Sequence, residues 1–202
     1  THGVSNMLRA YVRGYNEGTL NPTPNWRVVR ESPGTTTIDA DRGLGIILGR
    51  RAMELAMDKA RTVGVGVTTM HSSGHLGAVG HFAMLAAKKD MVGVCITAGG
   101  DRIVPTFAAE GRLGANPISI AAPSRNEAPV LFDVATSAVA INKIGLAARV
   151  GATLLPGWIA DMDGNPILEE VPAPAPGEFY ALPIGGTREQ GSHKGYGFSM
   201  MV

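Results

Sequence analysis

Three histidines that stand close together along the chain are the side chains best suited to chemistry. His71, His75 and His81 follow an apolar run, and Ser72-Ser73-Gly74 separates the first two. An imidazole can bind zinc, and it also titrates near neutral pH. The cluster is therefore compatible with a metal site or with a single residue that transfers protons.

The residues around this cluster favour proton transfer. Two histidines four positions apart share one face of a helix, but the Ser-Ser-Gly between them indicates a loop. No glutamate stands beside the first histidine, and no acidic third ligand is close. We therefore predict no metal ligands and select His75 as the proton-transfer residue. A metal-dependent hydrolase that uses His71, His75 and His81 is the alternative from a different class of enzyme.

Two glycine-rich segments are candidates for phosphate binding. The glycines of Gly43-Leu44-Gly45-Ile46-Ile47-Leu48-Gly49 have the spacing of a variant dinucleotide-binding turn, but no strand ends in an acidic residue about 20 positions later. We interpret this segment as close packing of a turn on a helix. The second segment, Gly191-Ser192-His193-Lys194-Gly195-Tyr196-Gly197, follows Gly185-Gly186. We predict a loop there whose backbone N–H groups and Lys194 bind an anion.

Phe132-Asp133-Val134-Ala135-Thr136-Ser137 is predicted to run from a strand into a helix. Thr136 or Ser137 is suited to cap that helix, and a helix start is a natural anion site. Asp133 is placed to accept a hydrogen bond from a hydroxyl group.

The pattern of apolar residues predicts both helices and strands. Helices are expected over 4–16, 50–62, 80–89 and 136–150, and strands over 26–29, 35–38, 63–69, 92–97, 118–121 and 130–134. Cys95 in the 92–97 strand is interpreted as a small core residue. The stretch 152–192 is rich in proline and glycine and is expected to be mostly loop. Strands that follow one another between 92 and 134 favour a mixed or antiparallel sheet.

Composition limits the function classes. The chain has 202 residues, of which 45% are hydrophobic, so it can bury a sizeable core. Eighteen Lys and Arg residues against 17 Asp and Glu residues give a net charge of +1, and we expect no nucleic acid or membrane partner. A single cysteine excludes an internal disulfide, and we expect a cytoplasmic protein. The chain begins without Met and stops in an apolar segment, so we expect a fragment.

Six segments, taken in order, are similar to one enzyme family. The chain resembles the malate/L-lactate dehydrogenase family of the second type, which includes ureidoglycolate, sulfolactate and diketogulonate dehydrogenases and an imine-reducing branch. The resemblance spans the whole chain and is carried by Thr1-His2-Gly3-Val4, Ser73-Gly74-His75-Leu76-Gly77, Gly114-Ala115-Asn116-Pro117-Ile118, Asp133-Val134-Ala135-Thr136-Ser137, Pro156-Gly157-Trp158 and Lys194-Gly195-Tyr196-Gly197.

The resemblance implies an α/β fold of the α+β type. It implies a non-Rossmann NAD(P)-binding domain with a mixed, largely antiparallel sheet over residues 71–202, and part of a helical substrate and dimer domain over residues 1–70. It also implies a homodimer that transfers a hydride between NAD or NADP and C2 of a small 2-hydroxy or 2-oxo acid. An NAD(P)H-dependent cyclic imino acid reductase is the alternative within the same family.

The resemblance also assigns site residues. Catalytic proton transfer falls on His75 or His2, and we expect Arg9 and Asn116 to contact substrate. The implied cofactor contacts are Gly99, Phe132, Asp133, Val134, Ala135, Thr136, Ser137, His193 and Lys194. Two departures from the family pattern bear on the substrate: Asn6 stands where the family often has arginine, and Thr97-Ala98-Gly99 replaces Thr-Asn-Ser.

Overall fold

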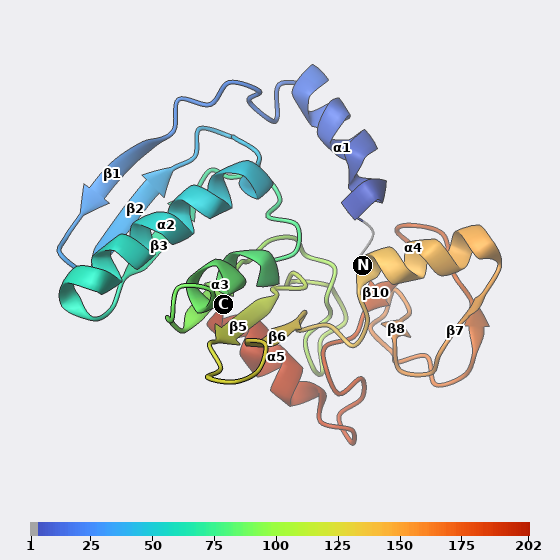
Figure 1. The fold of residues 1–202 in the computed structure, drawn as a ribbon. Coiled ribbons are helices and arrows are strands. Elements are labelled where there is room, and N and C mark those ends of the chain that lie inside the picture. The colour runs from blue at the N-terminus through green and yellow to red at the C-terminus, as the bar shows by residue number, and fades with distance from the viewer. Residues whose placement is uncertain (1–3) are drawn as a thin grey trace. The chain divides into compact units, whose positions relative to one another are not determined.

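The computed structural model describes residues 4–202 and contains helices and short strands in mixed order (Figure 1). His2, one of the two predicted proton-transfer residues, lies outside the described residues. The elements are α1 (Val4–Asn16), β1 (Arg27–Glu31), β2 (Thr35–Asp39), α2 (Gly45–Val63), β3 (Val67–His71), α3 (Gly80–Ala87), β4 (Gly93–Ile96), β5 (Ile118–Ala122), β6 (Val130–Val134), α4 (Ile141–Val150), β7 (Thr153–Leu154), β8 (Ile159–Ala160), β9 (Val171–Pro172), β10 (Tyr180–Ala181) and α5 (Ser192–Met201).

The described chain forms two compact units. The first unit comprises residues 4–95 and 119–132, and the second comprises 96–118 and 133–202. This structural division differs from the functional division that the sequence predicts at residue 70, and the functional division stays a prediction. No helix within residues 4–202 is long and apolar enough to cross a membrane.

The first unit contains a three-stranded sheet in the order β1-β2-β3. β2 pairs antiparallel with β1 and parallel with β3, so that Asp39 lies opposite His71 at the carboxyl end of the parallel pair. Helix α2 connects β2 to β3 and contacts both strands (Figure 1). β2 alternates strictly, and its buried Thr36 and Ile38 point to one face. The last residue of β3 is therefore His71, the first residue of the histidine cluster.

Helix α2 differs from the prediction at both ends. It begins at Gly45 rather than residue 50, because tertiary packing overrides the low helix propensity of Gly45 and Gly49. It continues to Val63 and ends at Gly64, which has φ 90° and donates its N–H to the carbonyl of Ala60. The predicted strand at 63–69 therefore starts later, at Val67.

Helix α3 packs on the second sheet of the described chain, which has the order β4-β5-β6. Ala83 and Ala87 of α3 are buried against Ala121 of β5, and Cys95 of β4 is partly buried in the same cluster. The packing confirms Cys95 as a core residue of a strand.

The second unit has its own apolar core around α4. It consists of Val139, Ile144, Ala147, Leu154, Ile159 and Phe179. Two antiparallel pairs, β8 with β10 and β7 with β9, lie within the stretch that the sequence suggested to be mostly loop.

The prediction of a helix start at Thr136 is wrong, because α4 begins at Ile141 after Ala140. The hydroxyl of Thr136 donates to the carbonyl of Ala115 at 3.1 Å, and that of Ser137 donates to the carbonyl of Val139 at 2.8 Å. Both hydroxyls are therefore donors to backbone carbonyls and cap no helix.

The prediction of a loop over Gly191–Gly197 is also wrong, because helix α5 starts at Ser192. A Cβ at Gly195 would collide with the backbone of Ile184, so close packing explains why glycine occurs inside this helix. The glycines that suggest a loop in the sequence allow a helix to approach another segment closely.

Candidate functional site

His75 lies in the loop between β3 and α3, and its side chain contacts Tyr11 of α1. The Nδ1 atom of His75 and the Oη atom of Tyr11 are 2.6 Å apart. Tyr11 is only 9% exposed, whereas His75 is exposed as a whole residue. A buried tyrosine hydroxyl needs a hydrogen-bond partner, and here that partner is the predicted catalytic imidazole.

The loop that carries His75 is held to the segment before α2 by backbone hydrogen bonds. The N–H of Gly74 donates to the carbonyl of Gly43 at 2.9 Å, and the N–H of Ile46 donates to the carbonyl of His75 at 3.1 Å. A Cβ at Gly45 would collide with the carbonyl oxygen of Gly74. The first glycine-rich segment therefore packs a helix start against a turn, as predicted, and it fixes the backbone of His75.

Partial burial shifts the pKa of each partner so that its neutral form is favoured. Desolvation lowers the pKa of His75 below its ordinary value, because its ring is partly buried although the residue as a whole is exposed, and partial burial disfavours the charged imidazolium. Desolvation also raises the pKa of Tyr11, because burial disfavours the phenolate. At neutral pH the pair is therefore a neutral imidazole beside a protonated phenol.

The three histidines do not converge on one point. His71 Nδ1 lies 3.0 Å from the Ser72 hydroxyl, and the ring of His81 meets Phe82 edge-on. No group of three or more His, Cys, Asp or Glu side chains within residues 4–202 is arranged to hold a metal ion. The donor geometry therefore gives no support to a metal-dependent hydrolase built on His71, His75 and His81.

In the second unit, Asn116 is the centre of a buried hydrogen-bond network. Its Nδ2 atom donates to the carbonyl and hydroxyl oxygens of Ser199 at 2.9 and 3.0 Å, and its Oδ1 atom accepts from the N–H of Gly99 at 3.2 Å. Asn116 is 5% exposed. Its amide is thus fully engaged by the protein, and this arrangement fixes the backbone at Gly99.

The segment Asp133–Ser137 runs beside this network. The N–H of Thr136 donates to the carbonyl of Ala115, and its carbonyl accepts from the N–H of Ile184, both at 2.8 Å. Thr136 is thus hydrogen-bonded to Ala115, the residue before Asn116. Val134 and Ala135 precede Thr136 and are half-buried, and Ser137 follows it and is buried. Asp133 is half-buried, and Phe132, at the end of the first unit, is 56% exposed.

The start of α5 carries the two predicted basic residues. His193 and Lys194 are both exposed in the first turn, and the side chain of Lys194 folds back over Gly191, the residue before the helix. Within the part of the chain that the structure describes, no carboxylate pairs with Lys194. A helix start that also carries a free ammonium group favours an anion.

A cavity of about 420 Å³ adjoins the start of α5. The hydroxyls of Thr106 and Ser192 lie 2.8 Å apart in its wall, and the guanidinium of Arg188 lies 5.0 Å above the ring of Phe107. Apolar walls with a few polar groups are typical of small-molecule sites. Sequence reasoning missed this cavity, because its wall is assembled from three separate segments.

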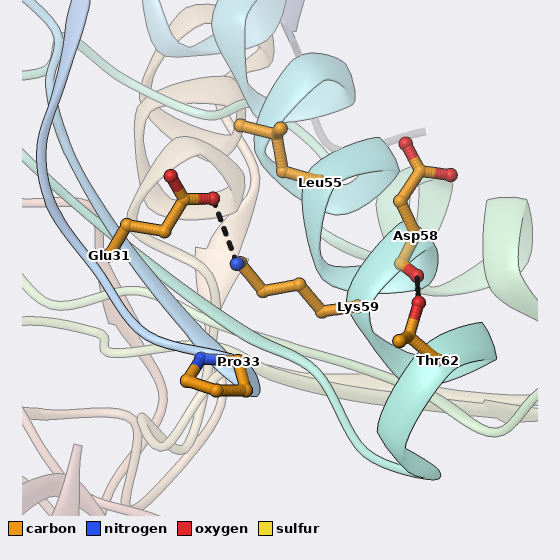
Figure 2. Close-up of a pocket in the computed structure, with 6 residues that line it drawn as sticks. All are labelled: Glu31, Pro33, Leu55, Asp58, Lys59 and Thr62. Carbon is orange, nitrogen blue, oxygen red and sulfur yellow. Dashed lines mark hydrogen bonds and ion pairs between the residues drawn. The ribbon is translucent and has the colours of Figure 1, made fainter.

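A second pocket, in the first unit, has a different character. Figure 2 shows that its cation, Lys59, points at Glu31, and the two are paired at 2.9 Å. Lys59 also donates to the carbonyl of Ser32 at 2.7 Å. The charged side chains of this pocket are all paired within the protein, Lys59 with Glu31 and Asp58 with Arg61, so we do not include the pocket in the candidate site.

Two further side chains complete the account of the predicted site. Arg9 is an exposed residue of α1, the helix that also carries Tyr11. Tyr11 itself was missed as a site residue, since in the sequence it is one apolar position of a helical pattern. Its partner is 64 positions away, and only the need of a buried hydroxyl for a partner could have signalled it.

Comparison with known proteins identifies the family. The family model described as malate/L-lactate dehydrogenase matches residues 1–202. The malate dehydrogenase of Pyrococcus horikoshii is 41% identical over 100% of this chain and 55% of the relative. The Delta(1)-pyrroline-2-carboxylate/Delta(1)-piperideine-2-carboxylate reductase of Pseudomonas putida is 33% identical over 100% of this chain and 57% of the relative.

A solved structure supports the same assignment. The crystal structure of malate dehydrogenase from Entamoeba histolytica matches with a TM-score of 0.89 at 32% identity, and the match covers 99% of this chain and 56% of that chain. This similarity confirms the mixed α/β fold. The chain spans about half the length of the relatives it matches. Because the family model covers every residue of it, the chain belongs to the malate/L-lactate dehydrogenase family.

Proposed function

We propose that the complete protein is an NAD(P)-dependent oxidoreductase that interconverts a small 2-hydroxy acid and its 2-oxo acid. The observation that carries the proposal is His75. It lies in a family motif, Tyr11 holds one nitrogen of its ring, and burial lowers its pKa toward a neutral base. In the oxidising direction this base takes the proton of the 2-hydroxyl group, and in the reducing direction its protonated form returns it.

The nicotinamide cofactor supplies the hydride chemistry when it is bound. The second unit offers residues that fit such a group: the backbone at Gly99, the segment Val134–Ser137 and the exposed pair His193 and Lys194. The free ammonium of Lys194 at a helix start suits the pyrophosphate that NAD and NADP share. These residues, together with Phe132 and Asp133, are our proposed cofactor contacts on a non-Rossmann, largely antiparallel framework.

The substrate carboxylate needs a cationic partner, which Asn6 cannot provide. We propose Arg9 for this role, since it is an exposed guanidinium on the same helix as Tyr11. Asn116 is better suited to hold the cofactor segment at Gly99 than to reach a substrate. A homodimer remains our expectation for the complete protein, and sedimentation would test it.

A cyclic imino acid reductase is the second candidate, because a relative with that printed name is 33% identical over the whole chain. The same imidazolium would then give its proton to the imine nitrogen of the substrate, which becomes the amine nitrogen of the product. Steady-state rates of the complete protein on malate-like, lactate-like and cyclic imine substrates separate the two candidates.

The proposal is tested with His75→Ala in the complete protein. We expect turnover to fall by about 10²–10⁴-fold, because a positioned acid–base group contributes that much, while cofactor affinity stays unchanged. His81→Ala is the matched control, since this imidazole is exposed and, among the described side chains, its only ring contact is with Phe82. Turnover of His75→Ala close to that of the unmodified protein would refute the assignment.

A further inference from the structure

We propose that Tyr11 is the positioning residue of His75: its hydroxyl holds Nδ1 and leaves Nε2 as the atom that exchanges the proton with substrate. The inference rests on the proposed function, because it assigns the proton step to one atom of the same imidazole. It concerns a residue that no sequence motif points to.

The contact between Tyr11 and His75 is short and is made by polar atoms. The 2.6 Å between Tyr11 Oη and His75 Nδ1 is a short hydrogen bond, and it joins two elements that are 64 positions apart. The rings are tilted by 33° with centroids 6.0 Å apart, so the contact is made by the polar atoms and not by stacking. Among the described side chains, which begin at residue 7, none forms a hydrogen bond with Nε2 of His75.

Hydrogen bonds hold the His75 side of this contact, and packing holds the Tyr11 side. The backbone of His75 is held by the N–H of Ile46, and the turn before it is held by the carbonyl of Gly43. On the other side, Leu20 packs against both Gly14 of α1 and Gly74, as the contacts that a Cβ at either glycine would make show. The hydroxyl of Tyr11 is therefore presented to the imidazole by packing as well as by its own hydrogen bond.

The hydrogen bond to Tyr11 determines which ring nitrogen of His75 carries the proton. Burial keeps the Tyr11 phenol protonated, so its O–H donates to Nδ1 of the neutral ring, and the ring proton lies on Nε2. When the ring is cationic, Nδ1–H donates instead and the Tyr11 oxygen accepts. A hydroxyl can do both because it rotates, whereas a carboxylate only accepts.

This exchange balances the proton step. In the reducing direction the Nε2–H bond of the imidazolium breaks, its electron pair stays on the ring, and an O–H bond forms on the substrate oxygen. The remaining ring proton stays on Nδ1 and points at the Tyr11 oxygen. In the oxidising direction the same bonds form and break in reverse. Tyr11 thus keeps its hydrogen bond in both directions without adding a charge beside the ring.

The test compares Tyr11→Phe with Tyr15→Phe. Both variants remove one phenolic hydroxyl from α1 and keep the ring, but only Tyr11 contacts His75. The first readout is the ¹⁵N spectrum of the imidazoles, in which the His75 signals are identified by their loss in His75→Ala. We expect one neutral tautomer, with the proton on Nε2, in the unmodified protein and in Tyr15→Phe. In Tyr11→Phe we expect a mixture of both tautomers.

The second readout is turnover of the complete protein. Loss of one hydrogen bond to the ring costs about 1 kcal/mol, so we expect kcat to fall about 5-fold in Tyr11→Phe with KM less affected, and no change in Tyr15→Phe. An unchanged His75 spectrum in Tyr11→Phe overturns the inference, even if turnover falls. Normal turnover in His75→Ala instead overturns the proposed function, and the spectrum is independent of that outcome.

Discussion

At the scale of single residues, the environment of His75 determines how its chemistry depends on pH. Among the described residues, the only hydrogen-bond partner of its imidazole ring is the neutral hydroxyl of Tyr11, and desolvation is the cause that lowers the pKa of the ring. A carboxylate partner would have the opposite effect, because it favours the imidazolium.

We therefore predict opposite pH profiles for the two reaction directions. Oxidation needs the neutral imidazole, so kcat/KM should rise with pH and level off, with the midpoint of the rise below the ordinary histidine value of about 6.5. Reduction needs the imidazolium, so kcat/KM should fall as pH rises through the same lowered pKa. Initial rates in both directions across pH 4 to 9 (~0.5-unit steps) would measure this. A midpoint above the ordinary histidine value would contradict it.

The hydrogen bonds of Asn116 are expected to contribute both to folding stability and to cofactor binding. Asn116→Ala removes the donor to the buried carbonyl of Ser199 and the acceptor of the N–H of Gly99, while the Ser199 hydroxyl keeps the carbonyl of Gly114. We predict a loss of about 1–3 kcal/mol in the free energy of unfolding, because each unpaired buried group costs on that order, and weaker cofactor binding. Denaturant titration and cofactor fluorescence measure the two effects. Asn126→Ala, at an exposed position, is the control, and an equal loss there would refute the prediction.

At the scale of elements, glycines have two different roles that the sequence does not distinguish. Gly45 is in contact with the loop of His75, whereas Gly145 of α4 has open space where its Cβ would be. Gly45 is the first residue of α2 and Gly145 lies inside α4, so both are helical glycines with different tertiary surroundings.

The matched pair Gly45→Ala and Gly145→Ala should therefore change stability in opposite directions. Gly145→Ala should stabilise by about 0.5–1 kcal/mol, because alanine has the higher helix propensity. Gly45→Ala should destabilise, because its Cβ meets the carbonyl of Gly74, and it should lower turnover by displacing His75. Thermal unfolding and steady-state kinetics test both effects. If the Gly45→Ala variant were as stable and active as the unmodified protein, the loop of His75 would have moved to make room for the Cβ, and the prediction would be wrong.

Periodicity was sufficient for elements with a regular pattern and failed where packing decides. Apolar spacing predicted α1 at 4–16 and β6 at 130–134, and the structure has both at those bounds. It missed the first turn of α2 and all of α5, because glycines that pack closely look like loop glycines in a sequence. The same limit applies to the site: a motif marks His75, but the Tyr11 contact exists only in three dimensions.

At the scale of the whole molecule, the two units separate the proposed roles. His75 and Tyr11 lie in the first unit, and the proposed cofactor contacts other than Phe132 lie in the second. Each unit has its own tryptophan: Trp26 in the first, and Trp158 in the second, where it packs against the core around Ile144. The two fluorophores can therefore report the stability of each unit separately.

We predict that a nicotinamide cofactor stabilises the second unit more than the first. A ligand that binds only the folded form adds about 2.7 kcal/mol at a concentration 100 times its dissociation constant. In Trp26→Phe, where Trp158 reports, denaturant midpoints should rise with NADH or NADPH. In Trp158→Phe, where Trp26 reports, the rise should be smaller. Lys194→Gln should reduce the first shift, because it removes the ammonium proposed to hold the pyrophosphate, whereas Lys89→Gln in the first unit should not. Equal shifts at both tryptophans would mean that the units unfold as one cooperative body. If the denaturant midpoint at Trp158 did not shift, the proposal that the cofactor binds the second unit would be contradicted.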